Sequence, residues 1–481
     1  MSSPLKQAPA TNLDTRTLAD QAFSRAAGAP LVVGNAVRLL CDAADNYPAW
    51  LDAIARATRH IHFEMYILHE DATGQRFADA LIERARAGIA VRLVFDWIGA
   101  FRQTSRRFWN RLREAGVEVR CYNPPRLDDP FGWLSRDHRK CVVVDGEVAF
   151  VTGLCVGAAW TGDSARGLAP WRDTGVEVRG PAVADVARAF ADTWAACGSP
   201  LPPDQLPAAP GPAGTVALRV VADTPGATGL FRVDQLVAAL ARRTLWLTDA
   251  YYAGTGTYVQ ALRAAAHDGV DVRLLVPGRG NDIPVMQAIS RIGYRVLLEG
   301  GIRVFEWNGP MIHAKTAVAD GRWARVGSTN LNLASWIGNR ELDVIVEDEA
   351  FARAMEDRYL KDLAGSTEVV LNRRRVRAAG DVKTPRTRGA GGSANRAAAG
   401  ALRIGNALGA ALSPRRLHRR TDRPLLVRAG LALVALALVG MFWPRALAWP
   451  LAGIALWLGL ALLLRTARGS GGPPGATRGP S

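Results

Sequence analysis

Two short stretches of the chain carry the same reactive residue types at the same spacing. The pattern His-x-Lys-x4-Asp occurs in DHRKCVVVDG, residues 137–146, and again in IHAKTAVADG, residues 312–321. Its members are His138, Lys140 and Asp145 in the first copy and His313, Lys315 and Asp320 in the second. Histidine can exchange a proton near neutral pH and act as a nucleophile, and lysine adds positive charge. One copy could be a strand that begins with charges, whereas two copies indicate two halves of an active site.

The elements around both copies also recur, which indicates an internal duplication. Each half contains three strand-like runs before its motif, in the same order. These runs are IHFEMYIL, AGIAVRLVFD and GVEVRCYN in the first half, and LWLTDAYY, DGVDVRLLVP and GIRVFEWN in the second. β-branched runs alternate with Ala-, Leu- and Arg-rich helical stretches, a pattern typical of α/β units. In each motif the His and Lys are two apart, so in a strand their side chains would share one face.

Further matching segments make the chain similar to a known family. Besides the two motifs, WRDTGVEVRGPAV (171–183), GSTN (327–330) and NRELDVIV (339–346) resemble the phospholipase D superfamily, in particular the bacterial cardiolipin synthases and their relatives. The resemblance covers roughly residues 30–365. It implies an α/β fold of two duplicated α/β/α sandwich halves, related by a pseudo-two-fold, that gather both His-Lys pairs around one phosphate.

The resemblance also implies roles for these residues. Metal-free phosphodiester exchange needs a nucleophile, an acid for the leaving oxygen and fixed positive charge. We assign His138 as the nucleophile, forming a phosphohistidine, and His313 as general acid and then base, although the sequence symmetry allows the reverse. A histidine nucleophile needs an acceptor on its other ring nitrogen. Asp173 and Glu341, which occupy matching places after the motifs, are the candidates, with ordinary surface carboxylates as the alternative.

Other residues near the motifs have expected roles as well. Ser328 and Asn330 resemble the phosphate-ligating pair of the family. In the first half Cys155 stands where the asparagine is usual, and a thiol is a poor donor, so we expect phosphate to be held asymmetrically. Asp145 and Asp320 each precede a glycine after an apolar strand, which favours a structural role in turns. No metal or cofactor is expected, because the five cysteines are scattered without a C-x-x-C pair.

Two tyrosines lie at matching strand ends near the expected cleft. Tyr66 and Tyr251 each lie near the end of the first strand-like run of their half. Their positions would allow contact with substrate. Core packing is the interpretation we favour for both.

The composition predicts the organisation of the chain. Pro and Gly concentrate between the two halves, and a polar, Ala-rich segment without an apolar run begins the chain. The expected parts are a disordered leader (1–29), a first repeat (30–200), a linker (201–214), a second repeat (215–370), a basic linker (371–424), a membrane hairpin (425–466) and a disordered tail (467–481).

The basic charge of the protein lies in its last part. From Arg373 onward the chain has 19 Lys or Arg against two Asp, a net of +17 in a total of +16, which leaves −1 for the preceding residues. Two apolar runs, 429–443 and 446–464, have arginines at their outer ends, which predicts a helical hairpin with both ends in the cytoplasm. A buried soluble hairpin or a re-entrant pair is the alternative.

These features favour a membrane-attached phosphatidyltransferase, specifically one that makes cardiolipin from phosphatidylglycerol. We expect it at the inner, cytoplasmic membrane with its catalytic domain facing the cytoplasm and with anionic phospholipids as partners. Hydrolysis to phosphatidic acid differs only in its second step and stays open. A phosphodiesterase acting on nucleic acid, and a scaffold without activity, are less favoured, because the catalytic region is near neutral and both motifs are intact. The oligomeric state is not predicted.

Overall fold

The computed structural model describes residues 12–125, 135–206 and 208–371, together with scattered residues between 438 and 460. The chain divides into a catalytic unit (1–125 and 131–371) and a second unit that includes residues 372–481. Among the described residues, no helix is long and apolar enough to cross a membrane. The expected basic linker from residue 372 onward, the disordered tail and almost all of the expected hairpin lie outside the described residues.

The first half forms seven strands of a mixed sheet. Their order is β1 (Val32–Cys41), β7 (Thr174–Arg179), β6 (Val148–Thr152), β5 (Lys140–Val144), β2 (His60–Met65), β3 (Ala90–Asp96) and β4 (Glu118–Tyr122). β2, β3 and β4 pair in parallel, and β1, β7, β6, β5 and β2 pair antiparallel. The parallel pairs need helical crossovers, as the alternating sequence pattern predicts.

The second half repeats this order and adds one edge strand. It runs β8 (Val216–Asp223), β14 (Glu341–Glu347), β13 (Trp323–Gly327), β12 (Thr316–Ala319), β9 (Thr244–Thr248), β10 (Asp271–Pro277), β11 (Arg303–Trp307) and β15 (Ser366–Val369). β1 and β8 pair antiparallel, so the described strands of both halves form one continuous sheet of fifteen. The expectation of a duplicated α/β fold is confirmed, and the direct joining of the two sheets is a feature that the sequence did not reveal.

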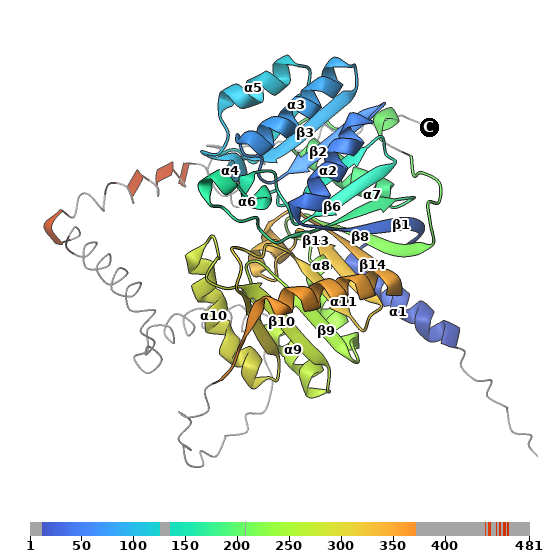
Figure 1. Ribbon diagram of the computed structural model, residues 1–481, viewed down its shortest axis with the longest axis vertical. Coiled ribbons are helices and arrows are strands. Elements are labelled where there is room, and N and C mark those ends of the chain that lie inside the picture. Colours follow the sequence, from blue (N-terminus) through green and yellow to red (C-terminus); the bar gives the residue numbers. More distant parts are fainter. Residues whose placement is uncertain are drawn as a thin grey trace, which may run out of the picture. The chain divides into compact units, whose positions relative to one another are not determined.

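Helices cover the sheet in three apolar clusters (Figure 1). The outer cluster of the first half contains α2 (Asp42–Ala55), α3 (Ala72–Arg86) and α5 (Arg106–Glu114). The outer cluster of the second half contains α8 (Gly229–Leu240), α9 (Gly256–His267) and α10 (Pro284–Glu299). A shared cluster holds α7 (Val183–Ala196) and α11 (Glu349–Ala364) against strands of both halves. Its residues come from both repeats, so the halves bury a common core.

The alternation along β5 matches these layers. Val142 and Val144 belong to the outer cluster, whereas Cys141 and Val143 belong to the shared cluster. Successive strand residues point to opposite faces, so a strand between two helical layers is apolar on both. This explains the continuous apolar run after Lys140.

The disordered leader expected over residues 1–29 is contradicted in part, because α1 (Asn12–Ala27) is a helix. Its last turns pack on the second half: Ala27 is buried in the outer cluster, and Phe23 packs beside it. The Arg219 guanidinium lies 5.6 Å from the Phe23 ring centroid and 3.8 Å from Asp20. An Ala-rich segment has high helix propensity, and these tertiary contacts supply what its weak apolar pattern lacks.

Asp145 and Asp320 lie at the ends of β5 and β12, in turns with φ of 56° and 54°. Asp145 accepts the backbone N–H groups of residues 58–60 at 2.8–2.9 Å. Asp320 accepts those of residues 242–244 at 2.7–3.0 Å. Each carboxylate therefore ties a turn to the start of the neighbouring strand, and neither touches the catalytic groups.

Candidate active site

The structure brings the four motif side chains together where the two halves meet. Lys140 is the first residue of β5, and His138 lies two residues before that strand; His313 and Lys315 lie just before β12. Of the four residues only Lys140 lies within a strand, and the other three lie just before β5 or β12, a small correction to the expected placement. All four are nearly buried, with exposed fractions of 8% for His138, 0% for Lys140, 5% for His313 and 1% for Lys315.

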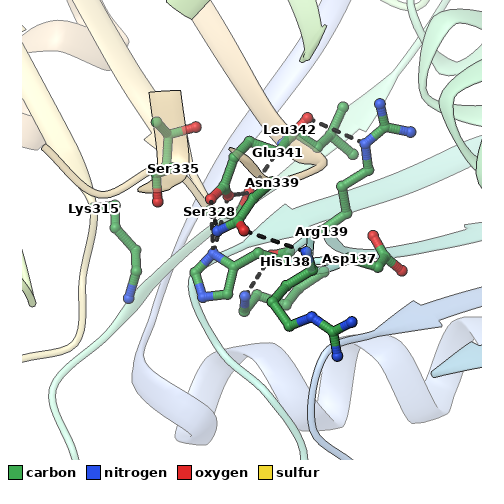
Figure 2. A network of polar contacts seen from close by, with 12 residues as sticks. Asp137, His138, Arg139, Lys315, Ser328, Ser335, Asn339, Glu341 and Leu342 are labelled. Atoms are coloured by element: carbon green, nitrogen blue, oxygen red, sulfur yellow. Dashed lines mark hydrogen bonds and ion pairs between the residues drawn. The ribbon is translucent and has the colours of Figure 1, made fainter. Parts of the chain in front are cut away.

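His138 is held by a carboxylate from the other half (Figure 2). Its Nδ1 lies 3.1 and 3.0 Å from the two carboxylate oxygens of Glu341. The Ser328 hydroxyl donates to Glu341 at 2.6 Å, and the Asn339 amide donates at 3.3 Å. The His138 backbone N–H also donates to Arg340 O at 2.9 Å. The ring is fixed by the NRE segment of the second half.

His313 is held in the reciprocal way by the first half. Its Nδ1 lies 2.7 Å from Asp173 Oδ2, which also accepts the Trp160 indole N–H at 3.1 Å. The Thr174 backbone N–H donates to the other Asp173 oxygen at 2.8 Å. The His313 backbone N–H donates to Arg172 O at 2.7 Å. Each half therefore supplies the carboxylate for the other half's histidine, so neither half contains a complete site.

Arg139, which lies between His138 and Lys140 in the sequence, forms hydrogen bonds that connect the two halves. Its fully buried guanidinium donates to Glu341 O at 3.1 Å and Asp223 O at 3.0 Å, both in the second half. It also donates to Ala189 O in α7 at 2.7 Å. A buried arginine that fills its donors in this way fixes the backbone on which Glu341 depends.

The two ring nitrogens of each histidine have different tasks. A carboxylate at Nδ1 favours the tautomer with its proton on Nδ1, which leaves the Nε2 lone pair available. Lys315 Nζ lies 3.0 Å from His313 Nε2. Among the described residues, nothing donates a hydrogen bond to His138 Nε2; the Lys140 ammonium donates to His138 O instead.

Burial and the neighbouring lysines keep both histidines neutral. Burial is the largest cause and, with Lys140 nearby, lowers the pKa of His138 to about 4 against the opposing effect of Glu341. Burial and Lys315 lower the pKa of His313 to about 3, against Asp173. Burial would raise the carboxyl pKa values, but the facing histidines outweigh it and hold the pKa values of Asp173 and Glu341 below their usual range. An anionic phosphate between the lysines would raise both histidine pKa values.

The expected phosphate ligand Ser328 has a different role in the structure. Its hydroxyl donates to Glu341 and accepts the Leu342 N–H at 2.9 Å, so it orients the carboxylate that holds His138. Its counterpart in the first half is Gly153, where a Cβ would lie 2.2 Å from Asp173 Oδ1. Serine cannot fit there, and Trp160 provides the matching hydrogen bond to Asp173.

Asn330 and Cys155 occupy matching positions in the two halves. Asn330 is buried, and its side-chain oxygen has no hydrogen-bond partner among the described residues. The Cys155 thiol is also buried, and burial raises its pKa although Lys140 and Lys315 oppose the shift. The influence of both lysines places the Cys155 thiol near the site, and Asn330 takes the matching position in the second half.

The two tyrosines contact the motif residues, and Tyr66 also packs against the outer apolar cluster of the first half, in agreement with the core-packing interpretation. The Tyr66 ring lies 5.0 Å from the His138 ring, edge to face, and 5.1 Å from Lys140 Nζ. The Tyr251 ring lies 5.8 Å from His313 and 5.7 Å from Lys315 Nζ. Aromatic faces stabilise lysine ammonium groups and exclude water, so both tyrosines line the site.

Sequence reasoning missed Asp249. Met65 pairs with Lys140, and Asp249 takes the corresponding place beside Lys315, because Thr248 pairs with Thr316. Asp249 is fully buried, accepts Leu331 N–H at 2.9 Å, and keeps one carboxylate oxygen unpartnered among the described residues. Burial raises its pKa to about 7 against the charge of Lys315. A charged residue at the end of an apolar strand was the signal available in LWLTDAYY.

A hollow of about 620 Å³ lies beside His313. Trp171, whose ring centroid is 5.7 Å from that of His313, forms part of its wall. Its other lining residues include His69, Asp71, Leu168 and Pro310. This mixed polar and apolar wall gives the buried site an adjoining space for a bound group.

The fold and the site define a phospholipase D-type enzyme, in which two duplicated halves bring two His-Lys pairs together. The family described as "Cardiolipin synthase, PLD-like domain" matches residues 50–194 and 237–363. The chain belongs to this family, and the resemblance inferred from the motifs is confirmed.

Known proteins agree with this assignment. Cardiolipin synthase A of Pseudomonas aeruginosa strain LESB58 is 36% identical over 359 residues, 74% of this chain and 72% of that protein. A cardiolipin synthase of Alkalihalophilus pseudofirmus is 30% identical over 346 residues, 71% of this chain and 68% of that protein. The crystal structure of a phosphatidylserine synthase of Haemophilus influenzae covers 73% of this chain and 92% of its own, with 14% identity and a TM-score of 0.57, and supports the fold.

Proposed function

We propose that the protein is a phosphatidyltransferase that joins two phosphatidylglycerol molecules into cardiolipin and releases glycerol. The observation that carries the proposal is the reciprocal pair of carboxylate-held histidines with lysines beside them. The curated relatives over most of the chain are cardiolipin synthases, which supports this substrate class.

In the first step, His138 Nε2 attacks the phosphorus of one phosphatidylglycerol. The bond from phosphorus to the glycerol headgroup breaks, and the leaving oxygen takes a proton from His313 Nε2, which receives that proton from Lys315 as the bond breaks. Lys315 Nζ, 3.0 Å from that nitrogen, can supply the proton in turn. Burial lowers the pKa of Lys315 to about 8, which makes its proton easier to transfer.

In the second step, the hydroxyl of another phosphatidylglycerol loses its proton to His313 and attacks phosphorus. The bond from phosphorus to His138 breaks, and cardiolipin leaves. Lys140 and Lys315 stabilise the negative oxygens of phosphorus in both steps. The nucleophile is His138 and not His313, because Lys315 occupies the Nε2 lone pair of His313.

Transfer is favoured over hydrolysis because the site is nearly closed. Both histidines are buried, and the rings of Tyr66 and Trp171 lie against them. Excluding water protects the phosphohistidine until an alcohol arrives.

Attachment to the cytoplasmic membrane, with the catalytic unit on the cytoplasmic side, is part of the proposal. Its support is the sequence of residues 425–466, with two apolar runs between arginine clusters. A chain that ends at residue 371 is expected to be extracted from the membrane fraction by alkaline carbonate, whereas the full chain stays in it.

The function is tested by incubating the purified full chain with phosphatidylglycerol vesicles and analysing lipids by mass spectrometry. Cardiolipin and free glycerol should form in equal amounts, and the His138→Ala variant should form neither. Phosphatidic acid as the main product would identify a hydrolase, and added ethanol would then yield phosphatidylethanol. No lipid product at all would refute the proposal.

A further inference from the structure

The outward face of α10 is apolar although it is exposed. Val285, Ile289, Ile292 and Val296 expose 62%, 42%, 57% and 44% of their surfaces. Their spacing of four, three and four residues places all four on one stripe of the helix. We call these residues the α10 stripe.

The opposite face of α10 already packs on the second half. Ser290, Tyr294 and Leu297 are buried there, and Ser290 Oγ donates to Tyr252 O at 2.6 Å. A helix that is apolar on both faces is normally covered on both. The α10 stripe therefore calls for an apolar partner outside the catalytic unit.

The matching helix of the first half shows that the fold does not require such a stripe. α5 lies between β3 and β4 as α10 lies between β10 and β11. Its buried face is apolar, but its exposed residues are Arg106, Arg107, Asn110, Arg111, Arg113 and Glu114. α5 is a usual amphipathic helix, and the apolar outer face is a property of α10 alone in this pair.

α10 is connected directly to the active site. Asp282, just before the helix, accepts the Tyr251 hydroxyl at 2.9 Å, and the Tyr251 ring lies against His313. The Asn332 amide donates to Tyr251 O at 2.9 Å, and the next residue, Leu333, is exposed. In Figure 1, α10 lies at the margin of the catalytic unit. The stripe therefore borders the rim through which substrate must reach His313.

The rim of the first half is apolar as well. Ile98 and Phe101, in and after the short helix α4 (Trp97–Ala100), are exposed. Gly99 of that helix packs so closely on Tyr66 that a Cβ there would lie 2.0 Å from Tyr66 O. Exposed apolar side chains thus adjoin both tyrosines of the site.

We infer that the α10 stripe enters the hydrocarbon edge of an anionic bilayer and places the active site at the level of the lipid headgroups. This inference rests on the proposed function, because a lipid substrate gives the rim its reason to be apolar. Arg291 and Arg295 are exposed on the flank of α10 and pair with Glu306 at 2.8 Å and Glu299 at 2.6 Å, so lipid phosphates would compete with these carboxylates for the two guanidinium groups. A bilayer fits better than a protein partner because the stripe borders the site that the lipid must enter.

The test uses the full chain in vesicles of phosphatidylglycerol and phosphatidylcholine. A spin label is attached to Ile292→Cys on α10 or, as a control, to His267→Cys at the exposed end of α9, with Cys41, Cys121 and Cys197 replaced by serine in both. In the vesicle-bound protein, the label at position 292 should collide more often with oxygen than with a water-soluble nickel complex. The label at position 267 should collide more often with the nickel complex than with oxygen. Strong nickel collisions at 292 would overturn the inference, as would shielding from both, which would indicate a protein partner or a second copy.

A functional comparison separates this inference from the proposed function. The double variant Ile289→Glu with Ile292→Glu should lose about tenfold or more of its activity on vesicles, because the bilayer contact is lost. It should keep its activity on monomeric short-chain phosphatidylglycerol, and the control Gln260→Glu with His267→Glu on α9 should keep both. Unchanged vesicle activity, or equal loss on both substrates, would refute the role of α10. An unsubstituted chain that makes no cardiolipin would refute the function instead, and the spin-label result would still judge the contact.

Discussion

The two halves repeat one strand order and place a His-x-Lys segment before matching strands, yet their surroundings differ. In the first half, His138 Nε2 is without a hydrogen-bond partner among the described residues, and Met65 lies beside Lys140. In the second half, His313 Nε2 accepts from Lys315, and the buried Asp249 lies beside that lysine. This difference supports the proposal that the first half supplies the nucleophile and the second half the proton transfer.

The carboxylates show how the halves depend on each other. Glu341 is oriented by a serine hydroxyl and Asp173 by a tryptophan indole, and each holds the histidine of the opposite half. Because these contacts are exchanged across the pseudo-two-fold, the site is complete only when the two halves of the sheet are joined.

The largest effect is expected from the histidines. His138→Ala should abolish cardiolipin formation, because no covalent intermediate can form. His313→Ala should lower kcat by roughly 10²–10⁴-fold, the usual worth of a general acid and base. Product formation followed by mass spectrometry measures both. If His138→Ala kept more activity than His313→Ala, the assignment of roles would be wrong.

Substitution of either carboxylate should have a large effect, and the two variants should respond differently to a better leaving group. Glu341→Gln and Asp173→Asn each disturb one histidine tautomer and should cost on the order of 10³-fold in kcat. A phosphatidyl ester with a nitrophenol leaving group needs little protonation, so it should restore intermediate formation in Asp173→Asn but not in Glu341→Gln. Burst kinetics measure this step. Equal rescue of both variants would contradict the division between nucleophilic and proton-transferring halves.

Asp249 should affect the pH dependence. Its negative charge raises the pKa of Lys315, which burial lowers to about 8, and Asp249 is itself ionised above about pH 7. Asp249→Asn removes this charge, so the pKa of Lys315 should fall further and the alkaline limb of kcat/KM should move to lower pH. The loss of rate at pH 8 should be about three- to tenfold. Met65→Leu at the matching place should leave the alkaline limb of kcat/KM unchanged. An alkaline limb that moved to higher pH in Asp249→Asn would contradict the influence of Asp249 on Lys315.

The smallest effects are expected where the halves differ in their polar groups. Asn330→Ala should lower kcat/KM by roughly 10–100-fold if its amide binds a charged phosphate oxygen. Cys155→Ala should change it less than about threefold, because a thiol is a weak donor. Kinetics on the same vesicles compare the pair. Similar losses for both would mean that phosphate is held symmetrically.

Much of the site could be predicted from the sequence, because the reactive residues repeat at a fixed spacing. His138, Lys140, His313 and Lys315 follow from the two motifs, and Asp173 and Glu341 follow from their matching places afterwards. The structural role of Asp145 and Asp320 agrees with the glycines that follow them. Patterns of this kind can be recognised in the sequence because each lies within one strand end and its turn.

Contacts between distant segments could not be predicted in the same way. The exchange of carboxylates depends on how the halves join at β1 and β8, which no local pattern encodes. Ser328 was interpreted as a phosphate ligand, but the position of Glu341 next to it in space decides its hydrogen bond. The contacts of Tyr66 and Tyr251 with the motif residues depend on tertiary packing, and so does the helix α1. Neither feature was expected from the sequence.

The most direct test of this account is to locate the covalent intermediate. The full-length His313→Asn variant, mixed with the nitrophenyl phosphatidyl ester and quenched at alkaline pH, should accumulate a phosphatidyl adduct that mass spectrometry of its peptides places on His138. The His138→Asn variant should show no adduct. An adduct on the remaining histidine of His138→Asn, or equal labelling of both sites in the unsubstituted chain, would contradict the claim that the two halves have separate chemical roles.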